Sequence, residues 1–399
     1  MNVSANRRRR WAAAAVTAAV VAAAAIAMLS RAALEAERGA EDADALGVSP
    51  FDLLAASVDE DFPRPPSPHV FEFPADHAAH DDYRTEWWSL SGTLSGPGDA
   101  GQPRLGVQWL LMRIGLRAPS RGEAEPAEDR SAWSTSQIYA GLFSISSPAG
   151  AGLEASGRLS RGAAGLAGAS APPVRIWLES WRLTELERAA DAPALALRLD
   201  AEGIELDLEL RNAKPPVTAG DVGSPGAPAP FQFYTQPRVE AQGTLVADGR
   251  RIEVAGRFSF EHAWGELPLP GGPVGTDRFT LHLDDGRELI LLRTHRTRAG
   301  GERTASTTGL LVGPDGSASP LGDDDVLLEP VGHWTSPRTG IRYPIRWSLE
   351  VPDRDLALAL TPPVADQEGE AWLRFWAGPV RVDGTAAGAG FVQLNGYAE

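Results

Sequence analysis

Short segments that alternate apolar and polar residues dominate the chain from Phe71 onward, and this period of two strongly limits the possible folds. It places successive side chains on opposite faces of a strand, whereas a surface helix repeats about every 3.6 residues. Asp-Gly pairs, which favour two-residue hairpin turns, separate several segments. We therefore predict an all-β body of up-and-down hairpins, a sandwich or a barrel. The predicted strands are Leu105–Ile114, Ile176–Leu183, Leu195–Asp200, Ile204–Leu210, Arg251–Trp264, Phe279–Leu283, Leu289–Arg293 and Trp347–Val351.

A weak internal repeat predicts two domains. The strand Ile204–Leu210 runs into Pro215-Pro216, and the alternating segment Leu356–Leu360 runs into Pro362-Pro363. Between them, residues 220–230 contain three glycines and three prolines, a composition typical of a linker. We predict an N-terminal β domain at residues 71–235 and a similar C-terminal domain at residues 236–399. One large sandwich with a long loop is the alternative.

The amino terminus has the charge pattern of an export segment. Four arginines, Arg7–Arg10, precede 20 uncharged residues, Trp11–Ser30, and Arg31 ends the stretch. About 20 apolar residues span a bilayer as a helix, and small residues at 25–27 have cleavage-site spacing. Residues 1–31 are thus predicted to be a cleaved signal peptide or a signal-anchor, with a soluble Ala-rich helix as the third alternative. Both a signal peptide and a signal-anchor would place the rest of the chain in the periplasm, and a signal-anchor would also hold it at the inner membrane.

Composition narrows the classes of function. The 37 basic and 53 acidic residues give a net charge of −16, which excludes a nucleic-acid binder because phosphate contacts need a basic surface. The absence of cysteine excludes disulfides, thiol nucleophiles and Cys-ligated zinc. Residues 32–70 are acidic and proline-rich, and we predict that they form a linker.

The first cluster of chemically interesting residues precedes and begins a predicted strand. His77 and His80 lie among three aspartates, Asp76, Asp81 and Asp82, which invites a metal site. Histidine pairs in such a loop are more often polar residues that satisfy backbone groups, and no metal is predicted. The strand that follows begins with Glu86-Trp87-Trp88.

Alternation in that strand places Glu86 and Trp88 on one face and Trp87 on the other. An inward carboxyl beside indole rings would have a raised pKa and could donate a proton. A structural salt bridge from Glu86 to Arg84 or Arg113 is the competing interpretation.

The second cluster is an aromatic row around a histidine. A period of two places Phe258, Phe260, His262 and Trp264 on one face of the strand, with Ser259 and Glu261 on the other. A histidine among inward aromatic rings is either a satisfied core residue or a titratable group in an apolar pocket.

These segments together resemble the CrtC/AttH-type lipocalin-like family, which includes carotenoid 1,2-hydratase and proteins labelled predicted secreted hydrolases. The resemblance covers about residues 70–399. It rests on the His77-x-x-His80 run before Glu86-Trp87-Trp88, on Trp133–Tyr139, Arg161–Gly168 and Lys214-Pro215-Pro216, on His262-x-Trp264, and on Leu283–Leu289.

The resemblance implies two tandem lipocalin-like (calycin) β-barrels, export, and for some members an ABC transporter permease as partner. In hydratase members a His-x-Trp pair acts without a cofactor, and this pair matches His262 and Trp264. The chain also departs from its relatives. Ala263 stands where relatives carry glutamate, and Thr276 and Arg278 flank Asp277 where relatives carry tryptophans. The strand Leu289–Arg293 supplies neither the tyrosine nor the aspartate that hydratases use.

Two functions are therefore considered in detail, and a third possibility is that the chain is a purely structural partner of a membrane transporter. In the first, the barrel binds a hydrophobic molecule, a lipid or isoprenoid. Its expected ligand-binding residues are Trp87, Trp88, Phe258, Phe260, His77 and His80. The alternative is acid-catalysed addition of water to an isoprenoid double bond, with Glu86, Asp277 or protonated His262 as donor and Trp264 and Trp88 stabilising the carbocation. No Gly-x-Ser-x-Gly elbow supports that class of serine hydrolase.

Overall fold

The structure, a computed structural model, describes residues 62–66, 69–97, 99, 104–118, 134–146, 152–187, 194–218, 231–265, 275–297 and 303–397. The predicted export segment and most of the predicted linker lie outside these residues. Within them, the helices are two single turns, η1 (Ala75–His77) and η3 (Pro352–Arg354). No helix of this described part has the length and apolar character needed to cross a membrane.

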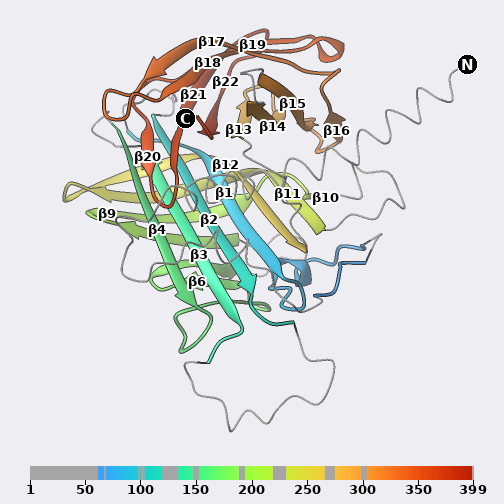
Figure 1. The fold of residues 1–399 in the computed structure, drawn as a ribbon, viewed down its shortest axis with the longest axis vertical. Coiled ribbons are helices and arrows are strands. Elements are labelled where there is room, and N and C mark those ends of the chain that lie inside the picture. Colours follow the sequence, from blue (N-terminus) through green and yellow to red (C-terminus); the bar gives the residue numbers. More distant parts are fainter. Residues whose placement is uncertain are drawn as a thin grey trace, which may run out of the picture.

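Strands make up most of the described chain and form two antiparallel sheets, one above the other in Figure 1. The first sheet has 12 strands in the order β4-β3-β2-β1-β12-β11-β9-β8-β7-β6-β5, with β10 added to β11. Its strands are β1 (Thr85–Ser95), β2 (Leu105–Gly115), β3 (Gln137–Ser146), β4 (Leu153–Arg161), β5 (Ala167–Ser170), β6 (Arg175–Leu178), β7 (Trp181–Glu187), β8 (Ala194–Ala201), β9 (Ile204–Asn212), β10 (Val217–Thr218), β11 (Phe231–Ala247) and β12 (Arg250–Gly265).

The first sheet curls into a nearly closed barrel. Arg158 of β4 donates to Asp200 of β8 at 2.7 Å, so that side chains bridge strands that are not neighbours in the hydrogen-bonded order. Inside lies an apolar core with Trp88, Trp109, Trp181 and Tyr234, all at most 1% exposed.

The second sheet is a half-barrel of 10 strands in the order β16-β15-β14-β13-β22-β21-β19-β18-β17, with β20 added to β21. Its strands are β13 (Gly275–Leu283), β14 (Glu288–Thr297), β15 (Arg303–Val312), β16 (Ala318–Leu321), β17 (Leu327–Thr335), β18 (Arg342–Val351), β19 (Leu356–Thr361), β20 (Glu368–Glu370), β21 (Arg374–Gly384) and β22 (Gly388–Asn395).

The two sheets repeat one strand order, which confirms the all-β fold with two tandem barrels. In each sheet the first strand lies between the second strand and the last, as β1 lies between β2 and β12, and β13 between β14 and β22. The strands of the double-proline repeat, β9 and β19, occupy matching places in these orders. The predicted boundary at residue 235 falls inside β11, however, and the sheets divide between Gly265 and Gly275. The reason is that the Gly- and Pro-rich segment 220–230 joins strands of one sheet.

The hairpin turns test the local predictions. Asp248 and Gly249, with φ of 51° and 70°, join β11 to β12 as the Asp-Gly signature predicts. The predicted strand Ile176–Leu183 is instead two strands, β6 and β7, which form a tight hairpin. Glu179 takes a φ of 56° at this turn, and no glycine or proline marks the reversal in the sequence.

A third apolar core holds the two sheets together. The outer face of β1–β3 contributes Trp87, Leu110 and Leu142, and these pack with Phe375 and Phe391 from β21 and β22. At another point of contact, Glu288 of β14 accepts from Lys214 Nζ at 2.5 Å and from Arg238 Nε. Lys214 also donates to the carbonyls of Gly286 and Gly313. A β-bulge in β11 between Gln236 and Val239 presents Arg238 to this cluster.

Lys214→Met is expected to lower the free energy of unfolding by about 3 kcal/mol, because it removes a buried cation from Glu288 and the hydrogen bonds that Lys214 donates to the Gly286 and Gly313 carbonyls. Denaturant unfolding of the full chain measures the change. The matched control is Arg198→Met, which breaks an exposed ion pair with Asp207 and should cost less than about 1 kcal/mol. Equal losses in the two variants would contradict a special role for the buried lysine.

Candidate functional site

The candidate site lies at one end of the first barrel, beneath the segment that precedes β1. We call residues 69–84 the capping segment. Its side chains His69 and Phe71 contact Trp264 at ring-centroid distances of 5.5 and 5.8 Å, and Phe73 contacts Tyr234 at 5.0 Å. The segment therefore packs its aromatic rings onto β11 and β12 at the barrel end.

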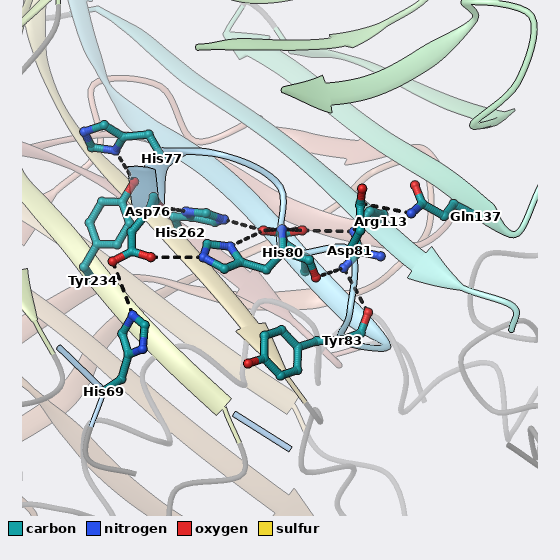
Figure 2. A network of polar contacts seen from close by, with 11 residues as sticks. His69, Asp76, His77, His80, Asp81, Tyr83, Arg113, Gln137, Tyr234 and His262 are labelled. Atoms are coloured by element: carbon teal, nitrogen blue, oxygen red, sulfur yellow. Dashed lines mark hydrogen bonds and ion pairs between the residues drawn. The ribbon is translucent and has the colours of Figure 1, made fainter. Parts of the chain in front are cut away.

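Glu86 is the centre of the site, and it is fully buried. Its carboxylate faces His262 Nε2 and His80 Nδ1, each at 2.9 Å, and accepts from Arg113 Nε at 2.9 Å and from the His80 backbone N–H. Figure 2 labels these three partners, His80, His262 and Arg113. Burial alone would raise its pKa, but the hydrogen bonds from both histidines and the charge of Arg113 outweigh burial and lower the pKa far below the ordinary value. Glu86 is thus held as a carboxylate.

His80 bridges Glu86 to a second carboxylate. Its Nε2 lies 3.1 Å from Asp76 Oδ1, so both ring nitrogens face anionic oxygens. Burial opposes a charged ring, but the hydrogen bonds to Asp76 and Glu86 outweigh it and raise the pKa of His80. The ring also stacks on Trp264, with centroids 3.6 Å apart and planes 4° apart, as suits an imidazolium on an indole face. His80 is therefore the imidazole of this network whose protonated form is favoured.

His262 continues the network into the barrel. Its Nδ1 lies 3.0 Å from the Asp76 carbonyl and its Nε2 faces Glu86, while the ring stacks on Trp88 at 4.9 Å. Burial, together with the nearby charge of His80, lowers the pKa of His262 although Glu86 acts against this. A neutral ring has a single N–H for its two acceptors, so an added proton would complete the second hydrogen bond. The network can therefore accept and release a proton inside the barrel.

A neutral pair flanks these charged groups. His77 Nδ1 and the Tyr234 hydroxyl lie 2.6 Å apart. Burial and the neighbouring His262 lower the pKa of His77 to about 4, and burial raises the pKa of Tyr234 well above its ordinary value. Tyr234 is absent from the residues that the sequence singled out. Tyr234 of β11 lies opposite His262 of β12. The only sign of this pairing in the sequence is the aromatic row around His262 in the next strand.

The histidines do not form the metal site that their spacing invited. His77 faces Tyr234, away from His80, whereas His80, Glu86 and His262 offer three ligand atoms within 4.8 Å of one another. A metal there would compete with the proton of His80 and would lie beside the Arg113 cation that Glu86 already binds. These donors fit a proton network better than a metal centre.

The other residues singled out by the sequence lie in three places. Trp88, Phe258, Phe260 and Trp264 share the first-barrel core with His262, as the alternation predicted. Trp87 lies on the opposite face, in the core between the sheets. Asp277, proposed as a proton donor, belongs to β13 of the second sheet, where it binds Arg293 and Tyr397. This corrects its assignment, because the chain passes to the other sheet between Trp264 and Asp277.

Two cavities of the described structure lie outside this network. One of about 1190 Å³ lies between the sheets, with Thr93, Arg257, His282 and Arg381 in its lining. The other, of about 580 Å³, belongs to the second sheet. Neither is lined by His262 or Trp264, so neither is the apolar pocket that the sequence analysis considered for this histidine.

The geometry can now be compared with known proteins. The AttH-like family profile matches residues 64–397, which is most of the chain. The chain belongs to the AttH-like family. This confirms the resemblance drawn from the sequence. No curated protein matches the chain at a significant level.

Solved structures agree with the family assignment. The crystal structure of an AttH protein from Nitrosomonas europaea aligns with a TM-score of 0.65 and 26% identity, covering 83% of this chain and 98% of that chain. Kievitone hydratase from Nectria haematococca aligns with a TM-score of 0.53 and 13% identity, over 82% of this chain and 93% of that chain. At this identity the second likeness concerns the lipocalin-like fold alone.

Proposed function

We propose that this AttH-like chain binds a hydrophobic molecule, a lipid or isoprenoid, at the end of the first barrel and adds water to one of its double bonds by acid catalysis. The observation that supports the proposal is the buried carboxylate of Glu86, shared by His80 and His262 beneath the aromatic rings of the barrel end. Titratable groups with shifted pKa values gather at catalytic sites, which is the physical basis of the inference.

Simple carriage of an oily ligand explains this network less well. A carrier needs an apolar space and a few polar groups for orientation. Here a carboxylate and an arginine are fully buried, and each needs the other to offset the lost hydration. Two further imidazoles with oppositely shifted pKa values add nothing to apolar binding. Proton transfer would explain why the buried carboxylate, arginine and imidazoles are kept despite their lost hydration.

The electrostatics assign the roles differently from the sequence. Arg113 and the two histidines hold Glu86 ionised, so Glu86 serves as the anion that favours the protonated form of His80, rather than as the donor. His80 is the donor, and its side chain remains 16% exposed at the barrel end. Its proton would pass to one alkene carbon, leaving a carbocation that Trp264 and Trp88 stabilise with their ring faces.

Water then completes the reaction. Its oxygen bonds to the cationic carbon, and the proton that it releases returns to the network through His80 or His262. The net change is one water molecule added to one double bond, and the protein is left in its starting protonation state. Because Trp264 is only 1% exposed, the capping segment must move for the substrate to contact the indole.

We further propose that this reaction takes place in the periplasm. The support is the charge pattern of residues 1–31, which predicts export or an inner-membrane anchor. A partnership with an ABC transporter permease is a proposal that rests on the family resemblance.

The direct test incubates the full chain with an acyclic carotenoid in detergent micelles and ¹⁸O-labelled water. A hydroxylated product that carries one ¹⁸O atom is expected, with a rate that falls as the pH rises through the raised pKa of His80. His80→Gln should lower the rate by about 100-fold or more, as general-acid removal does, while retaining substrate binding measured by tryptophan quenching. Binding without product in the wild-type chain would indicate a carrier and refute the enzymatic proposal.

A further inference from the structure

The cavity of about 1190 Å³ opens where the polar contacts between the two sheets come to an end. Side chains at alternate positions of β13 face the first sheet, and the first two have partners there: Arg278 lies 2.6 Å from Glu261, and the Thr280 hydroxyl lies 3.3 Å from that of Ser91. The next position of this face is His282, which lines the cavity together with Thr93 of β1, two residues after Ser91. The sheets therefore separate at His282.

His282 is the polar side chain of this face that lacks a partner. The residue is only 2% exposed, and neither ring nitrogen has a hydrogen-bond partner in the described part of the chain. Burial and the charges of Arg238, Arg257 and Lys214 lower its pKa, so the ring is neutral and offers one N–H and one lone pair. A buried imidazole without partners is costly unless a ligand atom meets it.

The lining of the cavity divides by burial into a charged part and an aliphatic part. Its described charged side chains are at least partly exposed, and each has an oppositely charged partner in the lining: Arg104 with Asp99, Arg211 with Glu209, Arg257 with Glu240 and Asp284, and Arg381 with Asp383. Besides Thr93 and His282, the buried residues of the described lining are aliphatic: Leu105, Ala241, Pro362 and Val382.

This division indicates the chemistry of an occupant. An ionised group in the buried part would lose its hydration without gaining a free counter-charge. A hydroxyl, by contrast, can donate to or accept from a neutral imidazole. No phenylalanine, tyrosine or tryptophan is among the described lining residues, so an aliphatic body fits these walls better than an aromatic ring that needs a stacking partner. The volume is sufficient for a chain of many carbon atoms.

We propose that the cavity between the sheets is a second ligand site, which binds an uncharged aliphatic alcohol. The hydroxyl of the ligand meets the His282 ring, and its aliphatic body packs against Leu105, Ala241 and Val382. The site is separate from the Glu86 network and does not depend on the hydration chemistry proposed there.

Isothermal titration calorimetry of the full chain near neutral pH with octan-1-ol, octanoate and octylammonium tests the proposal. The three probes share one aliphatic chain and differ in the charge of the head group. Octan-1-ol should bind more tightly than either ion by about tenfold or more, because the buried lining has no free counter-charge. His282→Leu should weaken the binding of octan-1-ol by about tenfold, since the hydroxyl loses its hydrogen-bond partner.

A second variant blocks the cavity without changing the histidine. Ala389 of β22 lines the cavity and lies opposite His282, so the phenyl ring of Ala389→Phe should fill the space and abolish the binding of octan-1-ol. Denaturant unfolding checks that each variant is folded before titration. The matched control is His333→Leu, which changes an exposed histidine of β17 outside this lining and should leave binding unchanged.

Several results would overturn this second site. They are the absence of heat with octan-1-ol, equal affinity for octan-1-ol and one of the ions, and full affinity in His282→Leu or in Ala389→Phe. None of these results bears on turnover at Glu86, so the two proposals fail independently.

Discussion

Glu86→Gln is expected to lower the free energy of unfolding by about 3–5 kcal/mol and to abolish the proposed hydration activity. The substitution leaves the Arg113 guanidinium, which is fully buried, without its counter-ion. It also removes one of the two carboxylates that raise the pKa of His80, so this pKa should fall. Denaturant unfolding measures the first effect, and an NMR titration of the His80 ring measures the second.

Glu205→Gln is the matched control, because Glu205 is an exposed glutamate of β9 in the same sheet. Its unfolding free energy should stay within about 0.5 kcal/mol of the wild-type value. An unchanged unfolding midpoint in Glu86→Gln, or an unchanged pKa of His80, would show that the carboxylate does not organise the network.

His282→Leu is expected to flatten the acid side of the stability profile. The His282 side chain lines the cavity between the sheets and is buried. Neither of its ring nitrogens has a hydrogen-bond partner among the described residues. Burial and the charges of Arg238, Arg257 and Lys214 lower its pKa from 6.5 to about 3. Because the folded-state pKa is depressed, stability is full above the unfolded-state value and is lost as the pH falls through this window.

The expected loss is about 1.4 kcal/mol for each pH unit between pH 6 and pH 4, and His282→Leu should remove this contribution. Urea unfolding at several pH values measures the slope for both chains, and their difference isolates His282 from other titrating groups such as His77. His333→Leu, at an exposed position of β17, is the control and should keep the wild-type slope. Identical slopes in wild type and His282→Leu would refute the prediction.

Most of the sequence prediction that the structure confirms came from the alternation of apolar and polar residues. It placed Phe258, Phe260, His262 and Trp264 on the inner face of one strand and separated Trp87 from Trp88, because strand geometry alone fixes these relations. It also explains why Glu86 was found: a lone carboxylate on an inward face is conspicuous in any alternating strand.

The partners of Glu86 were beyond the same reasoning. His80 and Asp76 lie in the capping segment, whose irregular path follows no period, and only its packing on Trp264 brings His80 against the carboxylate. The choice between Arg84 and Arg113 as the salt-bridge partner was left open by the sequence, and the pairing of β1 with β2 decides it for Arg113. Asp277 was misplaced because the Gly- and Pro-rich segment 220–230 was taken as the division between domains, whereas the sheets divide at residues 266–274, which contain three prolines and two glycines.

The pairing of β1 with β12 also sets the order in which the protein can be completed during synthesis. Glu86 and His262 are 176 residues apart, so Glu86 leaves the ribosome long before His262 is synthesised. Until then β1 offers one open edge, which β12 must later occupy for the barrel to close. A nascent chain that stops at residue 235 would lack both the closing strand and the histidine, whereas one that reaches Gly265 contains every residue of the Glu86 network.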